Sequence, residues 1–114
     1  MVLIMTFDFF FEQLNKGNPM MDEICFYFKN DENEIEHFIG YLPKYKNVIF
    51  TIKNDKPYWA GVCDIPNGCH FSTARELVDA KIYHGNSLCE LWDEIVICSI
   101  AGLSVEEWMI NFNK

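Results

Sequence analysis

Two apolar runs on either side of a polar turn, at residues 23–41, decide the fold. The first run, Glu-Ile-Cys-Phe-Tyr-Phe-Lys at residues 23–29, is dense in the β-branched and aromatic side chains that strands favour. Asn-Asp-Glu-Asn at residues 30–33 is typical of a turn, and Glu-Ile-Glu-His-Phe-Ile-Gly-Tyr follows at residues 34–41. The stretch therefore predicts a β-hairpin, in which His37 is a half-buried residue of the second strand.

Further strands are expected downstream of this hairpin. Val-Ile-Phe-Thr-Ile at residues 48–52 and Pro-Tyr-Trp-Ala-Gly-Val-Cys-Asp at residues 57–64 lie on either side of a polar turn. Four strands joined by short loops imply an antiparallel meander. The continuous apolar run Ile-Val-Ile-Cys-Ser-Ile, residues 95–100, is typical of a strand covered on both faces. Residues 81–83 are a candidate for a short edge strand.

Helix signals lie at both ends of the chain. Thr6 can cap a helix that runs to about Lys16, where Gly17-Asn18-Pro19 ends it. Three later stretches match the capping box, in which a hydroxyl and a carboxylate three residues apart each accept a backbone N–H; they are Thr73/Glu76, Ser87/Glu90 and Ser104/Glu107. These stretches predict helices over about 73–80, 87–94 and 104–112. The expected class is α+β, a mainly antiparallel sheet of four to six strands backed by three to four short helices.

Length and charge limit what the chain can be. Its 114 residues, half of them hydrophobic, fit a single globular domain spanning residues 1–114. Nine Lys and Arg against 17 Asp and Glu give a net charge of −8, which disfavours direct binding to nucleic acid or to a membrane surface. The apolar start has no basic residue before Lys16 and contains Asp8, which argues against a signal peptide. Five scattered cysteines favour reduced thiols, and hence a cytoplasmic protein.

Candidate catalytic and metal-binding residues are few. The sequence contains no glycine-rich phosphate-binding loop, nucleophile elbow or zinc-protease motif. Cys69 beside His70 is the best candidate nucleophile, but neighbours in an extended segment point to opposite sides, so an inert thiol is favoured. A zinc site would have to use residues whose spacing fits no known finger or ribbon, namely Cys63, Cys69, His70 and His84. We therefore expect no metal and no cofactor.

Surface charge offers a more promising signal. Acidic side chains cluster on the hairpin at Asp31, Glu32, Glu34 and Glu36, and lysines gather in the next two loops at Lys44, Lys46, Lys53 and Lys56. Solvated turns and protected strand edges explain this segregation as well as a binding role does. In the binding interpretation, the hairpin joins other acidic and aromatic residues in a patch for a basic partner: Trp59, Trp92, Asp93, Glu94 and the segment 106–108. Three tryptophans in a small core, however, need no partner.

The chain resembles, as a class, the small immunity proteins that protect bacteria against polymorphic and contact-dependent toxins. The likeness covers its short length, acidic charge, α+β pattern, many aromatic residues and lack of catalytic motifs; the most distinctive segments are residues 58–68, 72–77 and 86–92. The resemblance implies a non-enzymatic protein that binds a basic nuclease domain stoichiometrically, plugging its active site or occluding its substrate surface. Two alternatives stay open: a small regulatory or phage-encoded binding module, and a small enzyme that uses Cys69, His70 or His84.

Overall fold

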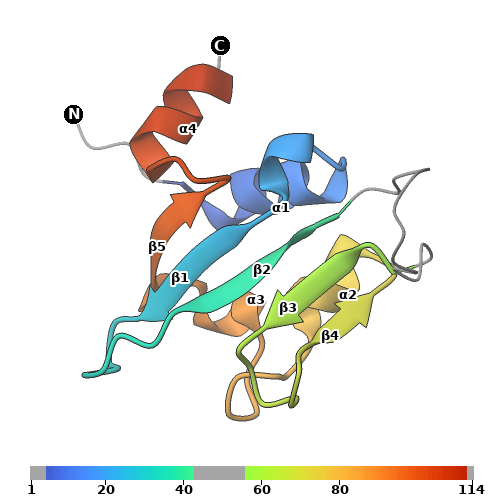
Figure 1. Ribbon diagram of the computed structural model, residues 1–114, viewed down its shortest axis with the longest axis vertical. Helices are drawn as coiled ribbons and strands as arrows, with labels where there is room; N and C mark the ends of the chain where they lie inside the picture. The colour runs from blue at the N-terminus through green and yellow to red at the C-terminus, as the bar shows by residue number, and fades with distance from the viewer. Residues whose placement is uncertain (1–4, 43–55, 113–114) are drawn as a thin grey trace.

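A computed structural model describes residues 5–42 and 56–112, and within them the chain forms one antiparallel sheet with helices (Figure 1). The strands are β1 (Ile24–Phe28), β2 (His37–Tyr41), β3 (Tyr58–Gly61), β4 (Cys69–Phe71) and β5 (Ile95–Ile100), in the order β4-β3-β2-β1-β5. The α-helices are α1 (Phe7–Asn15), α2 (Ala74–Asp79), α3 (Leu88–Leu91) and α4 (Val105–Phe112). Two 3₁₀ helices are η1 (Pro19–Met21) and η2 (Trp92–Glu94). The predicted α+β class is confirmed.

One face of the sheet carries the core. Strand residues alternate between the two faces, and the register places Ile24 opposite Ile39 and Ile39 opposite Ala60, so these buried side chains share a face. Figure 1 shows α1, α2 and α3 behind this face, while α4 lies beside the β5 end. The amphipathic stripe of α1 supplies Phe10 and Leu14, both fully buried, to the same core.

The described residues contain a meander of β1, β2, β3 and β4, but its third and fourth strands differ from the predicted ones: the sequence predicts residues 57–64 as the fourth strand, whereas β3 pairs directly with β2. The β1–β2 hairpin and β3 lie where the sequence places them, whereas the run 48–52 lies outside the described residues. The fourth described strand is β4, three residues long and too short for a periodic signal. It pairs with β3 because Gly68 turns the chain at φ +79°, where a Cβ would lie 2.4 Å from the Ala60 carbonyl oxygen. Residues 81–83 do not join the sheet; Tyr83 forms only an isolated bridge with Asn86.

The expectation that residues 95–100 form a strand covered on both faces is wrong. In the described residues β5 lies at the edge of the sheet and pairs only with β1. Ile95 and Ile100 are buried, but Cys98 is exposed at a register irregularity opposite Cys25 and Phe26. What contradicts the expectation is the exposure of Cys98; a continuous apolar run is compatible with a strand covered on one face or on both, so the sequence could not separate the two.

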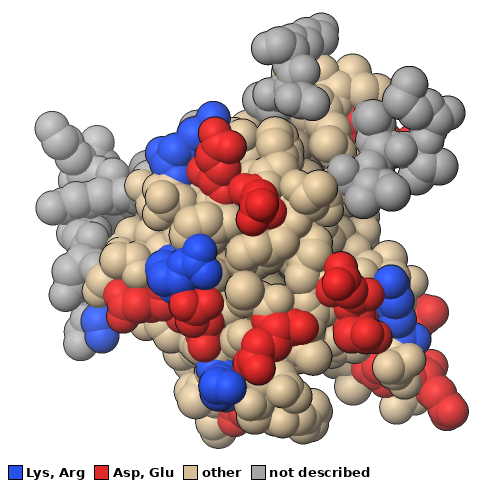
Figure 2. Space-filling model, turned by 180° about the vertical axis from the view of Figure 1, so that it is seen from behind, with Lys and Arg blue, Asp and Glu red and all other residues tan. Residues whose placement is uncertain are grey.

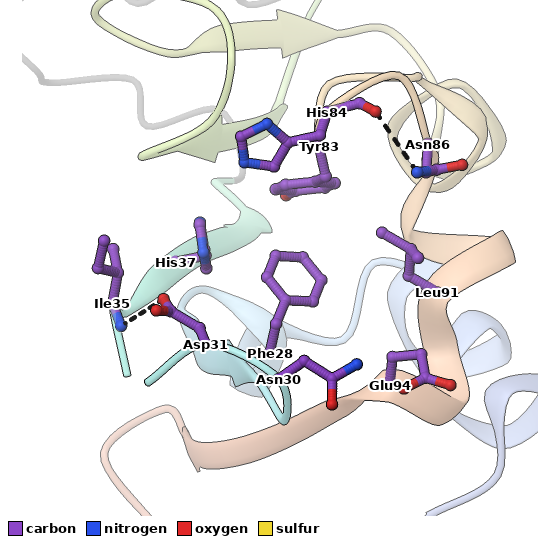
Figure 3. A pocket seen from close by; sticks show the side chains of 10 residues that line it. All are labelled: Phe28, Asn30, Asp31, Ile35, His37, Tyr83, His84, Asn86, Leu91 and Glu94. Atoms are coloured by element: carbon purple, nitrogen blue, oxygen red, sulfur yellow. Dashed lines mark hydrogen bonds between the residues drawn. The ribbon is translucent and has the colours of Figure 1, made fainter. Parts of the chain in front are cut away.

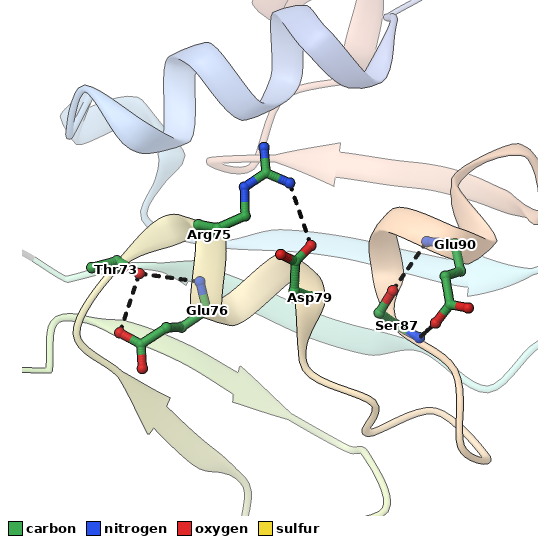
Figure 4. Close-up of polar contacts among 6 residues, drawn as sticks. All are labelled: Thr73, Arg75, Glu76, Asp79, Ser87 and Glu90. Carbon is green, nitrogen blue, oxygen red and sulfur yellow. Dashed lines mark hydrogen bonds and ion pairs between the residues drawn. The ribbon is translucent and has the colours of Figure 1, made fainter.

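All four predicted helix starts are confirmed. The hydroxyls of Thr6, Thr73, Ser87 and Ser104 each accept the backbone N–H of the residue three positions later. At Ser87 and Ser104 the glutamate also accepts the N–H of the cap residue, which completes the box. The Glu76 carboxylate instead accepts the Thr73 hydroxyl at 3.2 Å, so that box is half formed (Figure 4). The segment predicted as one helix over 87–94 is α3 followed by η2.

Replacing Ser87 with alanine is expected to lower the free energy of unfolding by about 0.5 to 2 kcal/mol. Ser87 is buried, its hydroxyl accepts the Glu90 N–H at 3.1 Å, and its own N–H donates to the Glu90 carboxylate at 3.0 Å. That N–H is the main cause of a lowered pKa at Glu90. Urea denaturation measures the change. Ser72→Ala, at an exposed position without a side-chain hydrogen bond in the described residues, is the matched control and should change stability little.

Candidate functional site

A groove of about 420 Å³ lies at the end of the sheet, between the β1–β2 loop and the segment that joins α2 to α3 (Figure 3). A smaller hollow of about 210 Å³ adjoins it, and five of the eight residues that line this hollow also line the groove. The residues that line the larger groove are Phe28, Asn30, Asp31, Ile35, His37, Tyr83, His84, Asn86, Leu91 and Glu94. Its walls are therefore aromatic and apolar, with carboxylates and amides at the rim.

Aromatic rings from three separate segments form the walls. Phe28 ends β1 and His37 begins β2, on the core-facing side of the hairpin, with their ring centroids 4.9 Å apart. Tyr83 meets both rings edge to face, at 5.6 Å from Phe28 and 5.7 Å from His37. Such T-shaped contacts are favourable because the positive edge of one ring meets the negative face of another. The cluster fixes the shape of the groove.

Tyr83 is an apolar wall rather than a titrating group. It is 3% exposed, and its hydroxyl is buried without a hydrogen-bond partner among the described residues. Burial raises the pKa of Tyr83 far above its ordinary value, and the nearby Cys63 and Cys69 raise it further. The phenol therefore stays neutral under physiological conditions.

The backbone around the groove adopts unusual conformations. Glu34, Val62 and His84 have φ angles of 48°, 57° and 54°, in the left-handed region that L-residues seldom occupy. Carboxylates hold two of these turns in place. Asp31 accepts the N–H groups of Asn33 and Ile35 at 2.9 and 3.0 Å, and Asp64 accepts the His84 N–H at 2.6 Å. Strained backbone of this kind gathers at functional sites, which supports the groove as the candidate site.

The structure brings only part of the predicted acidic patch together. Asp31 and Glu94 line the groove, and the exposed Glu32 and Glu34 stand on the loop beside it. Glu36 is exposed but accepts the Cys25 thiol at 3.4 Å. Because Cys25 alternates with the core residues Ile24 and Phe26, that contact lies on the sheet face away from the groove's aromatic cluster.

None of the three tryptophans lines the groove. Trp59, one residue from the core-facing Ala60, donates to the Asp22 carbonyl at 3.2 Å on the other face of the sheet. Trp92 packs against Phe10 with ring centroids 4.8 Å apart. Trp108 is fully buried and donates to the Met20 carbonyl at 2.9 Å, so its predicted place in a surface patch is wrong and the core interpretation is confirmed.

Asp93 is exposed next to Trp92, outside the groove. These two residues border a separate hollow that also contains Asp8. The Asp93 carbonyl accepts the Lys29 ammonium at 2.8 Å, and the Glu94 carbonyl accepts the Lys29 N–H at 2.8 Å. These bonds join the start of β5 to the end of β1. They leave the Glu94 carboxylate without a hydrogen bond or ion pair in the part of the chain that the structure describes.

The cysteine and histidine candidates do not converge. Cys69 packs against the core and the neighbouring His70 is exposed, which confirms that the two side chains point to opposite sides of β4. Across residues 5–42 and 56–112, no group of three or more His, Cys, Asp or Glu is placed to hold a metal ion. All five cysteines are free thiols, and burial is the main cause of a raised pKa, about 11 at Cys69 and about 12 at Cys25.

Native alkylation is expected to label Cys98 long before Cys25. Cys98 is exposed, whereas Cys25 is 5% exposed, and its raised pKa keeps it protonated well above pH 9, where an ordinary thiol ionises. Mass spectrometry of iodoacetamide-treated native protein gives the order directly, with urea-unfolded protein as the control in which both thiols react. Equal native rates, a disulfide or stoichiometric zinc would contradict this description of the cysteines.

Most residues that line the groove could not be predicted from the sequence. Phe28, Leu91 and Asn86 carry no chemical motif, and Tyr83 was expected only in a short edge strand. The available signal was the turn chemistry of residues 83–86, Tyr-His-Gly-Asn, which indicates a loop but not the surface that the loop approaches.

The chain matches no known protein family, no curated protein and no solved structure. In the described ranges, every helix is too short or too polar to span a lipid bilayer.

Proposed function

We propose that this chain is a cytoplasmic immunity protein, which binds a basic toxin domain such as a nuclease and blocks it by covering its positively charged substrate surface. The observation that supports the proposal is the grouping of exposed carboxylates at the β1–β2 loop beside an aromatic groove. Of the basic residues that the structure describes, Lys29 is adjacent to this loop, and the Asp93 carbonyl holds its ammonium. The loop carries four carboxylates, at residues 31, 32, 34 and 36, against this one ammonium group, so its charge is net negative.

The distribution of charge over the molecule supports the same proposal. Figure 2 shows red carboxylates spread over this face, including the lower right, where a basic side chain lies among them; the turn of 180° from Figure 1 brings the β1–β2 loop to that corner. Complementary charge accelerates the encounter of two proteins, and a buried apolar centre then slows their separation. The exposed Ile35 and Val62, each 49% exposed, provide apolar area at the rim of the groove and the adjoining hollow.

Co-production with a toxin domain tests this function. The proposal predicts a toxin gene directly beside the gene for this chain; its nuclease domain is expressed in a bacterial host with and without the chain, and growth and nuclease activity are measured. We expect growth to be restored and the purified pair to form a complex of fixed stoichiometry with no nuclease activity. Continued toxicity despite equal expression would contradict the proposal, and so would inactivation of an excess of toxin by a smaller amount of this chain, which would indicate catalysis rather than stoichiometric blocking.

A further inference from the structure

We infer that the groove binds an arginine side chain presented by the partner protein. The inference rests on the proposed function, because it names the partner group that the same surface takes. Three features support it: the Phe28 ring in the lining of the groove, carboxylates on both sides of that ring, and a comparable arrangement of arginine, phenylalanine and carboxylate elsewhere in this chain.

The comparable arrangement is on α1 and α2. The guanidinium carbon of Arg75 lies 4.1 Å from the centroid of the Phe11 ring, and one guanidinium nitrogen lies 3.3 Å from the Asp79 carboxylate. Figure 4 shows Arg75 and Asp79 reaching toward each other from the same helix. A cation over a ring face is attracted to the negative π-cloud, and the carboxylate fixes its orientation. This fold thus already holds one guanidinium between a ring and a carboxylate.

The groove also combines a phenylalanine ring with carboxylates, but no arginine of the described residues lines it. Figure 3 shows the Phe28 ring at the centre of the groove, with Asp31 on one side and Glu94 on the other. Phe28 is half-buried, and the Glu94 carboxylate has no ion pair among the described residues. The Asp31 carboxylate accepts two loop N–H groups. The amide oxygens of Asn30 and Asn86 are further acceptors at the rim.

Arginine fits this groove better than lysine or an apolar side chain. A guanidinium is planar, stacks on aromatic rings, and carries five N–H donors that can reach acceptors on both sides of one ring. A lysine ammonium is compact and strongly hydrated, so it gains less from an aromatic wall. An apolar side chain would desolvate the Glu94 and Asp31 carboxylates without pairing them, which is costly.

A small probe tests the site without any toxin. N-acetyl-arginine methylamide is titrated into the ¹⁵N-labelled full chain and followed by NMR, alongside the citrulline and lysine counterparts. Citrulline has nearly the shape of arginine but carries no charge. We expect the arginine probe to shift the resonances of residues 28–36, 83–86 and 94, with an affinity at least about tenfold above that of citrulline, because a charge-assisted contact is lost. Equal affinities, or shifts confined to other residues, would overturn the inference.

Glu94→Gln is the decisive variant, because the Glu94 side chain has no structural contact in the described residues and the substitution keeps its shape. We expect it to weaken binding of the arginine probe by about tenfold. Glu106→Gln, which removes another exposed carboxylate from the first turn of α4, is the matched control and should leave the affinity unchanged. An unchanged affinity in Glu94→Gln would overturn the site.

The two proposals fail in different ways. If the arginine probe shifts no groove resonance while the chain still blocks a toxin domain, the groove inference is wrong and the proposed function stands. If the probe binds as expected but no toxin domain is blocked, the immunity function is wrong, and the groove is an arginine-binding site for another protein.

Discussion

Gly40→Ala is expected to cost about 3 kcal/mol of folding free energy or more, and so to leave much of the protein unfolded. A Cβ at this position would lie 2.0 Å from the Asp22 carbonyl oxygen and 2.9 Å from Nε1 of Trp59. Neither neighbour can move freely, because Trp59 Nε1 donates to that same carbonyl at 3.2 Å. The main chain leading into β1 crosses β2 here, and only a residue without a side chain leaves room for it.

Gly61→Ala is the control that separates steric conflict from the general effect of losing a glycine. Gly61 lies on the neighbouring strand β3, and its added Cβ would meet only the Trp59 ring at 3.6 Å, an ordinary contact distance. Chemical denaturation followed by circular dichroism should show a change within about 1 kcal/mol for this variant. If both variants lose a similar amount of folding free energy, the close approach of Asp22 is not the reason that position 40 requires a glycine.

Reversing charge on the β1–β2 loop is expected to slow association with a basic toxin domain by one or more decades at low salt. The variant combines Glu32→Lys, Glu34→Lys and Glu36→Lys, three exposed side chains. Asp31 is left unchanged because its carboxylate holds the Asn33 and Ile35 N–H groups, so replacing it would disturb the loop itself. Surface plasmon resonance at two ionic strengths measures the rate constant, and the difference should shrink as salt screens the charges.

A variant with the same net charge provides the control. Glu12→Lys, Glu23→Lys and Glu106→Lys change exposed residues on α1, before β1 and on α4. If this variant slows association as much as the loop variant does, overall charge rather than the loop governs the encounter. If the loop variant associates normally at both ionic strengths, the interface belongs to another surface, such as the one around Trp92 and Asp93.

Local sequence signals predicted most helices and strands. The place of β5 in the sheet and the shape of the groove depend instead on contacts between residues far apart in the chain. Caps such as Ser87 are visible in sequence because the bonds they make span three residues. The edge position of β5 depends instead on pairing with β1, far away in the chain. The groove likewise exists because Tyr83 packs against Phe28. The sequence around Tyr83 and the sequence around Phe28 do not, taken separately, specify that contact. Of the predicted patch, Asp31 and Glu94 came together at this groove, whereas Trp59 and Trp108 serve packing.

The pairing of β1 with β5 also determines when the molecule can finish folding during its synthesis. The ribosome releases β1 early, but one edge of that strand stays open until residues 95–100 have left the exit tunnel. The hydrogen bond from the Trp108 indole to the Met20 carbonyl can form only later still, once Trp108 has been synthesised. A nascent chain that stops before β5 therefore exposes Phe26 and its neighbours as an unpaired apolar edge. Such a stalled chain is prone to aggregate, whereas in the completed protein β1 lies between β2 and β5 in the interior of the sheet.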